Sequence, residues 1–382
     1  MRIAAVSVAR SDYGIYRSVF AAITRSPSLE LTVIAGAAHL SERFGRTVDA
    51  IRDDGYDVGA EVPMVQDGDT PMDVARSVSQ GITGFSDAFE HLRPNLVLLL
   101  GDRYEMMAAA LAATLHCLPI AHIHGGELSF GAIDDALRHA ISKMSHLHFV
   151  TTSEYRRRVI QMGERPERVH EVGAPGLDTV AGFAPLSIDE LNERFSIQLK
   201  PGFVLCTYHP VTLDADATIS QFEHLLDSLR AHGCQVLFTM PNADAGGLKI
   251  RESISGFLAT CPGSFVVENM GTLGYFSAMH HAAAMVGNSS SGIIEAASFG
   301  LPVLNIGRRQ EGRIRGKNVV DAGGTAASID DALGKVLDAT FKSSLQNMAN
   351  PYGAGNSGEK IAQILATIGD PQQLLNKGFH DI

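Results

Sequence analysis

The densest group of reactive side chains lies between His122 and His148, in HIHGGELSFGAIDDALRHAISKMSHLH. This stretch holds five of the fifteen histidines, together with Glu127 and Asp134. Carboxylates and imidazoles beside a glycine turn can transfer protons near neutral pH. We therefore take His124, Glu127 and Asp134 as candidates for acid/base chemistry.

Two other interpretations of this stretch stay open. The pairs His122-x-His124 and His146-x-His148 resemble zinc ligands, but alternate residues of a strand face opposite sides, so one member of each pair should point into the core. Core histidines and helix caps explain some of the five. In a helix beginning near Asp134, the i,i+4 spacing pairs Asp134 with Arg138, and it likewise pairs Asp135 with His139. Acid/base chemistry is favoured over a metal site.

A second candidate site is the segment from Met285 to Arg313, MVGNSSSGIIEAASFGLPVLNIGRRQEGR. It predicts a strand, a loop with Ser289 and Ser290, a helix containing Glu295, another strand and a basic loop. A hydroxyl-rich loop that opens a helix offers N–H groups and the positive dipole end to a phosphate. The loop could instead only cap the helix. With Arg309 after the next strand, anion binding is favoured.

Four further motifs follow predicted strands. They place Arg10 in ARSDYG, Asp102 and Arg103 in GDRYE, His209 in TYHPVT and Asn242 in PNADAGG. Functional groups of open α/β sheets gather at the carboxyl ends of the strands. Helix caps, a structural ion pair and a turn are the alternative interpretations.

Composition restricts the class of protein. A chain of 382 residues fits two domains of roughly 150 to 200 residues each. Its net charge of −11 argues against a nucleic-acid partner. No apolar run reaches the length of about 18 residues that a membrane span needs, and the N-terminus does not resemble a secretory signal. Four cysteines without CxxC spacing indicate free thiols in a reducing cytoplasm.

Short apolar runs alternate with amphipathic ones along most of the chain, which predicts parallel sheets covered on both faces. The alternation pauses at the glycine- and proline-rich stretch 173–186, so we place a domain boundary near residue 180. We predict two Rossmann-like, doubly wound α/β domains facing a ligand cleft. They comprise residues 1–180 and 181–355. A C-terminal helix in 356–382 returns to the first domain. The predicted strands are Ile3–Val8, Leu31–Gly36, Asn95–Leu100, Pro119–Ile123, Leu147–Thr151, Phe203–Tyr208, Gln235–Met240, Ser264–Val267, Met285–Gly287 and Pro302–Ile306.

With these motifs, the sequence resembles the UDP-N-acetylglucosamine 2-epimerase family, in the hydrolysing branch that feeds sialic acid and related nonulosonic acid synthesis. The resemblance covers nearly the whole chain, from ARSDYG through GDR, HGGE, HPVT, PNADAG and GNSSSGIIEAASFG to RRQEGR. It implies a GT-B type fold, no metal or nicotinamide cofactor, a nucleotide-sugar substrate and a homodimer or homotetramer.

The family's reaction eliminates the nucleoside diphosphate across C1 and C2 of the sugar to give a 2-acetamidoglycal. Water then adds and releases a free manno-configured sugar. By matching positions, the resemblance implies acid/base roles for Asp102 and Asp134, and it places His209 near the diphosphate. Nucleotide-binding positions match Arg10, Arg103, Ser289, Ser290, Glu295 and Arg309. Sugar-pocket positions match His39, His146 and His148.

One departure concerns the proton chemistry. Sialic-acid-type members resemble HIEGGE, whereas this chain has HIHGGELSFG, with His124 at the position of their active-site glutamate. Glu127 or His124 itself could take over that role. The histidine form resembles the legionaminic-type branch, which favours a UDP- or GDP-linked 2,4-diacetamido-2,4,6-trideoxyglucose over UDP-N-acetylglucosamine. A non-hydrolysing 2-epimerase, a retaining GT-B glycosyltransferase and a nucleotide-sugar sensor are the alternatives.

Overall fold

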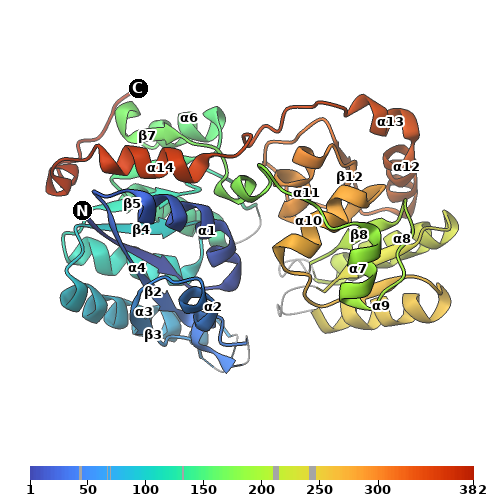
Figure 1. The fold of residues 1–382 in the computed structure, drawn as a ribbon, viewed down its shortest axis with the longest axis horizontal. Helices are drawn as coiled ribbons and strands as arrows, with labels where there is room; N and C mark the ends of the chain where they lie inside the picture. Colours follow the sequence, from blue (N-terminus) through green and yellow to red (C-terminus); the bar gives the residue numbers. More distant parts are fainter. Residues whose placement is uncertain (43–44, 67, 69, 131–132, 210–214, 241–246) are drawn as a thin grey trace. The chain divides into compact units, whose positions relative to one another are not determined.

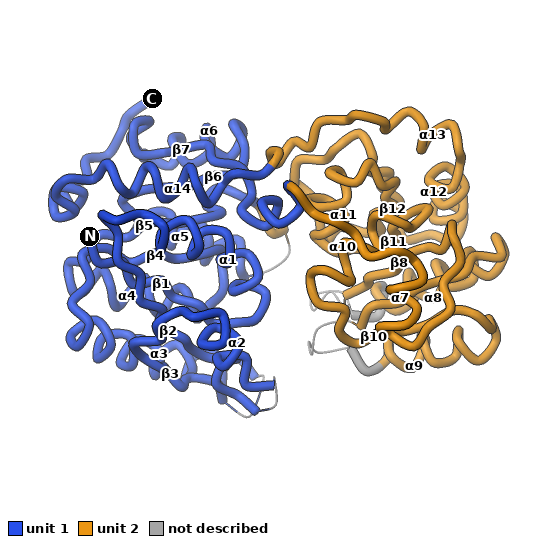
Figure 2. Tube along the Cα trace, viewed as in Figure 1, with its two compact units in different colours: residues 1–127, 133–181, 355–382 blue, residues 128–132, 182–354 orange. Residues whose placement is uncertain are grey.

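The structure is a computed structural model that describes residues 1–382 except 43–44, 67, 69, 131–132, 210–214 and 241–246. It divides into two compact units, coloured separately in Figure 2. The first comprises Met1–Glu127, Ile133–Ala181 and Gly355–Ile382, and the second comprises Leu128–Ala132 and Gly182–Ala354.

The first unit is built on a seven-stranded parallel sheet in the order β3-β2-β1-β4-β5-β6-β7 (Figure 1). Its central strand β4 has the sequence LVLLL and is buried throughout, as expected for a parallel strand with helices on both faces. The strands are β1 (Arg2–Ser7), β2 (Glu30–Gly36), β3 (Val58–Val62), β4 (Leu96–Leu100), β5 (Ile120–Ile123), β6 (Leu147–Val150) and β7 (Val169–Glu171).

Two helices of the first unit, α3 and α6, begin at a threonine whose side chain caps them. The long helix α3 starts with a Thr70–Asp73 capping box and Pro71 in its first turn, which satisfies N–H groups that a helix start leaves open. The last helix, α14, packs beside the first, α1 (Figure 1). The helices are α1 (Arg10–Arg25), η1 (Ala37–Leu40), α2 (Val48–Asp53), α3 (Pro71–Leu92), α4 (Tyr104–Leu115), α5 (Ile133–Met144), α6 (Ser153–Gln161), η3 (Pro166–Arg168), η4 (Pro175–Thr179), α14 (Ser357–Ala366) and η6 (Pro371–Leu375).

The second unit has a six-stranded parallel sheet in the order β10-β9-β8-β11-β12-β13. Its core joins Phe222, Phe238 and Phe257 to apolar strand residues. The strands are β8 (Val204–Thr207), β9 (Val236–Thr239), β10 (Phe265–Val267), β11 (Ala284–Gly287), β12 (Val303–Ile306) and β13 (Val319–Ala322). The helices are α7 (Ile188–Phe195), α8 (Ala215–Ala231), α9 (Gly247–Thr260), α10 (Gly271–His281), α11 (Ser290–Ile294), η5 (Ala296–Phe299), α12 (Ala326–Leu337) and α13 (Ala339–Ser344).

Each sheet reverses its strand order at one point, between β1 and β4 in the first unit and between β8 and β11 in the second. Loops that leave the carboxyl ends of two such strands diverge to opposite faces and leave a crevice, where open α/β sheets bind ligands. Each unit is therefore a doubly wound, Rossmann-like domain, as the sequence predicts. Three motifs leave these four strands directly: GDRYE after β4, TYH after β8 and GNSSSG after β11.

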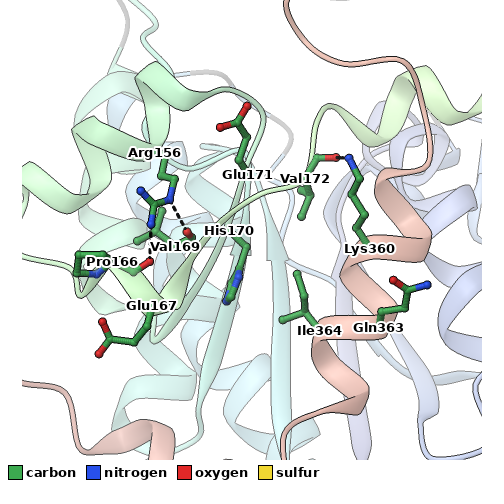
Figure 3. Close-up of a pocket in the computed structure, with 10 residues that line it drawn as sticks. All are labelled: Arg156, Pro166, Glu167, Val169, His170, Glu171, Val172, Lys360, Gln363 and Ile364. Carbon is green, nitrogen blue, oxygen red and sulfur yellow. Dashed lines mark hydrogen bonds between the residues drawn. The ribbon is translucent and has the colours of Figure 1, made fainter.

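The outer edge of the first sheet is protected by side chains around a cavity of about 390 Å³. Figure 3 shows Arg156 donating to the backbone oxygens of Val169 and Pro166, while Lys360 of α14 donates to that of Val172. One of these carbonyl groups, that of Val169, belongs to the edge strand β7, and the other two flank its ends. A strand edge covered in this way is a poor template for pairing with another chain.

Three further observations concern thiols, membrane spans and groups of possible metal ligands. All four cysteines are free, and burial raises the pKa of the Cys206 thiol, which makes it unreactive. Within the described ranges, no helix has the length and apolar character to cross a membrane. The same residues include no group of three potential ligands placed to hold a metal ion.

Candidate functional site

The loop after β5 holds a histidine–carboxylate pair. The Nδ1 atom of His124 lies 2.6 Å from Oε1 of Glu127, and Thr151 donates to the same oxygen at 3.1 Å. Because an ionised carboxylate can only accept, Nδ1 carries the proton, and Nε2 of the neutral ring then presents a lone pair. Nε2 is buried and has no hydrogen-bond partner among the described residues. The pair has the arrangement of a general base oriented by a carboxylate.

Arg138 of α5 joins this loop to the end of β4. Its side chain is 4% exposed; it donates to the His124 carbonyl at 2.9 Å and forms an ion pair with Asp102. The sequence predicted an Asp134–Arg138 pair by helical spacing. The observed partner is instead Asp102, because the guanidinium points from α5 towards the sheet. Arg138 thereby fixes both Asp102 and the backbone of His124.

Asp134 lies in the first turn of α5 and is half-buried. Burial raises its pKa, and the nearby charge of Asp102 raises it further. A carboxyl group with a raised pKa is suited to act as an acid. Oδ2 of the neighbouring Asp135 lies 3.7 Å from Nε2 of His139. The second pair expected from the helical spacing is therefore confirmed.

Arg103 precedes α4 and is held by Glu105, whose oxygens accept from it at 2.9 and 3.2 Å. Asp12 lies nearby, and burial raises its pKa to about 6 although the charge of Arg103 opposes this. Arg10 opens α1 at the carboxyl end of β1, where its side chain is exposed. Ala9, and no side chain, occupies the N-cap position of α1.

His39 lies after β2 and is fully buried. Ser7 contacts its Nε2 at 2.8 Å and Thr47 its Nδ1 at 2.7 Å. Burial lowers its pKa to about 4. Protein side chains thus engage both ring nitrogens, and the ring supports the loop after β2.

His146 and His148, placed in the sugar pocket by the resemblance, do not join the groups at the carboxyl edge. His146 precedes β6, at the amino end of the sheet, and its Nδ1 accepts from the Ile120 N–H at 3.1 Å. His148 is fully buried and lies 3.0 Å from Glu164. Burial would raise the pKa of Glu164, but hydrogen bonds from His148, Lys143 and Lys377 lower it to about 2. This cluster fastens the C-terminal segment to α5 and β6.

In the second unit, β11 ends close to β8. Gly287 has φ +133°, and a Cβ there would lie 2.0 Å from the Thr207 oxygen, so only glycine fits. Asn288 then pins His209, accepting from its N–H at 2.7 Å and donating to its carbonyl at 2.8 Å. The two loops that leave the switch point are therefore locked together.

Ser289 caps α11 by accepting from the Ser291 N–H at 3.3 Å, and Ser290 begins the helix. The helix has only five residues and continues as a 3-10 turn after Glu295, so Glu295, predicted within the helix, is instead its C-cap residue. Tyr275 lies under the loop, where burial raises its pKa to about 12 and the charge of Glu295 acts in the same direction. The loop offers hydroxyl and N–H groups to an anion.

The basic loop after β12 returns to Asn288. Arg309 and Gln310 each donate to the Asn288 carbonyl at 3.0 Å. Burial lowers the pKa of His209 to about 3, and the charge of Arg309 lowers it further. Arg308 is exposed and pairs with Glu311. Arg309 is thus held against Asn288, at the start of the serine loop, whereas Arg308 is paired with Glu311.

Asn242 lies outside the described residues. Sequence reasoning missed Thr151, Tyr275 and Gln310. Thr151 could have been found because it stands at the carboxyl end of a predicted strand. Asp102 and His124 were singled out for their similar positions just after predicted strands. Tyr275 and Gln310 lie within a helix and a loop, and no local pattern marks them.

The sequence matches the model of the family described as UDP-N-acetylglucosamine 2-epimerase over residues 21–366. A Legionella pneumophila protein named UDP-N,N'-diacetylbacillosamine 2-epimerase (hydrolyzing) is 37% identical over 372 residues, 97% of each chain. A Campylobacter jejuni protein named GDP/UDP-N,N'-diacetylbacillosamine 2-epimerase (hydrolyzing) is 36% identical over 383 residues, covering 100% of this chain and 99% of the relative.

The fold is similar to that of the Methanocaldococcus jannaschii UDP-GlcNAc 2-epimerase solved with UDP-GlcNAc and UDP. The TM-score is 0.80 at 16% identity, over 96% of this chain and 99% of the other. At this identity the likeness concerns the fold alone, which is of the GT-B type.

Proposed function

Because the chain belongs to the UDP-N-acetylglucosamine 2-epimerase family, in its hydrolysing branch, we propose that it releases free 2-acetamido sugars from a nucleotide-linked substrate with inversion at C2. The observation that carries the proposal is the His124–Glu127 pair beside Asp102 and Asp134 in the first unit. These groups supply a base and an acid of different proton affinity, as an elimination followed by an addition requires.

In the first step, Nε2 of His124 takes the C2 proton while Glu127 stabilises the resulting imidazolium. The C1–O bond to the nucleoside diphosphate breaks, and the electrons of the C2–H bond form the C1=C2 double bond of the glycal. The leaving diphosphate is anionic. Ser289, Ser290 and Arg309 of the second unit are the groups that we assign to bind it.

In the second step, water adds across the double bond. Asp102, whose carboxylate is paired with Arg138, takes a proton from the water that attacks C1. Asp134, whose raised pKa keeps its proton more firmly, protonates C2 from the face opposite to the one that lost its proton. The product is the free sugar of inverted configuration at C2. His124 and Asp102 have each gained a proton and Asp134 has lost one, so reprotonation of Asp134 and release of one net proton to solvent restore the enzyme.

We further propose that the sugar is a 2,4-diacetamido-2,4,6-trideoxyglucose, the chemical equivalent of N,N'-diacetylbacillosamine. The relatives from L. pneumophila and C. jejuni carry that substrate in their names. The histidine at position 124, in place of the glutamate of sialic-acid-type members, agrees with the same assignment. UDP-N-acetylglucosamine is the second candidate substrate.

Nucleotide release in heavy water tests the reaction. The enzyme is incubated with UDP-N-acetylglucosamine and with UDP- and GDP-linked 2,4-diacetamido-2,4,6-trideoxyglucose. We expect release of nucleoside diphosphate together with a free reducing sugar that carries deuterium at C2. A product that remains nucleotide-linked would indicate a non-hydrolysing epimerase, and transfer without deuterium at C2 would indicate a glycosyltransferase.

We also propose a homodimer or homotetramer located in the cytoplasm, which rests on the family resemblance and on the free thiols. Light scattering of the purified full-length chain measures the oligomeric state. A monomeric mass would contradict that part of the proposal and leave the reaction unaffected.

A further inference from the structure

Helix α5 carries Asp134 and Arg138, two groups of the site in the first unit, but few apolar side chains hold it in place. Of its twelve residues three are buried, and two of these, Arg138 and Ser142, are polar. The third is Ile141, and Met144 in the last turn is partly buried against the core. Most helices are fixed by burial of a continuous apolar face. The position of α5 therefore depends to a large extent on its polar contacts.

The carboxyl end of α5 receives a side chain from the far end of the chain. Nζ of Lys377 donates to the carbonyl oxygens of Lys143 and Ser145 at 2.6 and 2.5 Å. It also lies 2.8 Å from Oε1 of Glu164. An ammonium group has three N–H donors, so each of them has a partner. The last carbonyl groups of a helix lack partners within it and form the negative end of its dipole, and a lysine there satisfies both.

Glu164 joins this lysine to the body of the first unit. Its side chain is 2% exposed, and its Oε1 lies 2.8 Å from Nζ of Lys143 in the last turn of α5. Its Oε2 lies 3.0 Å from Nε2 of His148 in β6. One buried carboxylate thus connects α5, β6 and the C-terminal segment. Removal of a partner from such a buried ion leaves its charge less compensated, so the arrangement resists displacement.

The segment that carries Lys377 is itself fixed on both sides. On one side, Arg168 donates to backbone oxygens within residues 373–376. On the other, the ring of Phe379 covers Gly163, where a Cβ would lie 2.3 Å from Cε2 of the ring. The side chain of Lys377 is accordingly only 15% exposed. Its ammonium group is held at the end of α5 by the chain on either side of it.

We propose that Lys377 is a positioning residue for the proton chemistry, which fixes the carboxyl end of α5 and thereby the positions of Asp134 and Arg138. The inference rests on the proposed function and deepens it. All the groups concerned belong to the first unit. From Asp134 to Lys143 the helix spans about 14 Å, so a displacement of one end is transmitted to the other. Misplacement of a reacting group by about 1 Å can cost about a hundredfold in rate.

The two steps of the reaction should respond differently to a displacement of α5. Asp134, assigned to protonate C2 in the second step, lies on the helix, and so does Arg138, which holds Asp102. His124, assigned to remove the C2 proton in the first step, lies on the loop after β5. Displacement of α5 should therefore slow the addition of water more than the elimination. The 2-acetamidoglycal would then leave the enzyme before water adds.

The test is the glycal fraction, the share of released nucleoside diphosphate that is matched by free 2-acetamidoglycal. Lys377→Met removes the ammonium group and keeps the length of the side chain. We expect free-sugar formation to fall by about tenfold or more and the glycal fraction to rise, while the affinity for UDP stays at the wild-type value. Lys377→Arg keeps a cation and should restore part of the loss. The matched control is Lys360→Met, which alters a lysine of α14 that donates to the Val172 carbonyl at 3.3 Å (Figure 3); its glycal fraction should equal that of the wild type.

The glycal fraction is measured on molecules that turn over, so a loss of folded protein does not change it. A wild-type fraction in Lys377→Met, even at a lower rate, would overturn the positioning role and leave the proposed reaction intact. If Lys377→Met does not fold, Lys377→Gln, which keeps a neutral donor, is measured in its place and a wild-type fraction has the same meaning. Failure of the wild-type enzyme to release nucleoside diphosphate from any of the nucleotide sugars would instead overturn the proposed function itself.

Discussion

The carboxyl edge of the first sheet and that of the second differ in how their side chains are held. In the first unit the polar groups bind one another: His124 pairs with Glu127, and Arg138 with Asp102. In the second unit they bind the backbone, since Asn288 pins the main chain of His209 and Arg309 donates to a carbonyl.

This difference matches the chemistry that we assign to each edge. Proton transfer depends on the relative proton affinities of neighbouring side chains, and charged partners adjust these. Binding of an anion depends instead on fixed donors, which a pinned backbone supplies. Removal of a charge should therefore damage the first edge through the rate of chemistry, and the second through affinity.

The strongest test of the comparison is Asp134→Asn. The amide cannot donate a proton to carbon, so formation of the free sugar should fall by about a thousandfold with the 2-acetamidoglycal as the product that accumulates, whereas the affinity for UDP should not change. The matched control is Asp135→Asn, which neutralises the adjacent carboxylate that faces His139. Steady-state rates of reducing-sugar formation and titration calorimetry with UDP measure the two quantities. An equal loss in both variants, or unchanged activity in Asp134→Asn, would remove Asp134 from the mechanism; loss of activity with UDP binding kept would count against a sensor.

A smaller effect is expected for Glu127→Gln. The amide oxygen still accepts the Nδ1 proton of His124, but it no longer stabilises an imidazolium, so kcat should fall by about a hundredfold. Thr151→Val removes only one hydrogen bond to Glu127 and should cost about tenfold or less. Rapid-quench measurement of nucleotide release compares the two. A larger loss of kcat in Thr151→Val than in Glu127→Gln would contradict the proposal that His124 and Glu127 act as a pair.

Arg309→Ala tests whether the carboxyl edge of the second sheet supplies the affinity for the nucleotide. Loss of a charge-assisted donor should weaken UDP binding by roughly thirtyfold, about 2 kcal/mol. The adjacent Arg308 is the control, because it is exposed and pairs with Glu311; Arg308→Ala should stay within about twofold of wild type. If the two variants bind UDP equally well, Arg309 does not hold the diphosphate.

The smallest expected effect concerns stability in acid. Burial lowers the pKa of His122 to about 3, while its unfolded value is about 6.5. Between these values the unfolded chain binds the proton and the folded chain does not, so stability is lost as the pH falls below about 6.5, by up to about 1.4 kcal/mol per pH unit. His122→Asn should reduce this slope in urea unfolding at several pH values. His232→Asn, on the surface of the second unit, should keep the wild-type slope; equal slopes in all three proteins would contradict the prediction.

Most of the strands that the sequence predicted are well buried, and those that it missed are not; β10 is the exception, an edge strand of intermediate burial that was predicted. All ten predicted strands are present within one or two residues of their expected ends. The missed strands β3, β7 and β13 are edge strands, and their burial is partial. An edge strand needs few apolar residues, so its hydrophobic pattern is weak.

The site divides in a similar way. The candidate groups at Asp102, His124, His209 and Ser289 all leave strands, and their positions follow from the strand pattern alone. The surroundings of His146 and His148, at the start of β6, did not follow from the strand pattern. Sequence spacing cannot show that Lys377, from the far end of the chain, meets Glu164 beside His148. His146, one residue before the strand, marks its amino end and therefore lies away from the site.

By itself, the sequence determined which residue types stand at the carboxyl ends of parallel strands, because strand periodicity and the direction of the chain fix those ends. It also determined the family, through motifs in a fixed order. Only the tertiary structure decided which side chains form ion pairs and hydrogen bonds with one another. Arg138 pairs with Asp102 although Asp134 is nearer along the chain, and Glu127 binds His124. Hydrogen-bond partners depend on the directions of side chains from separate elements, which packing sets and local spacing does not encode.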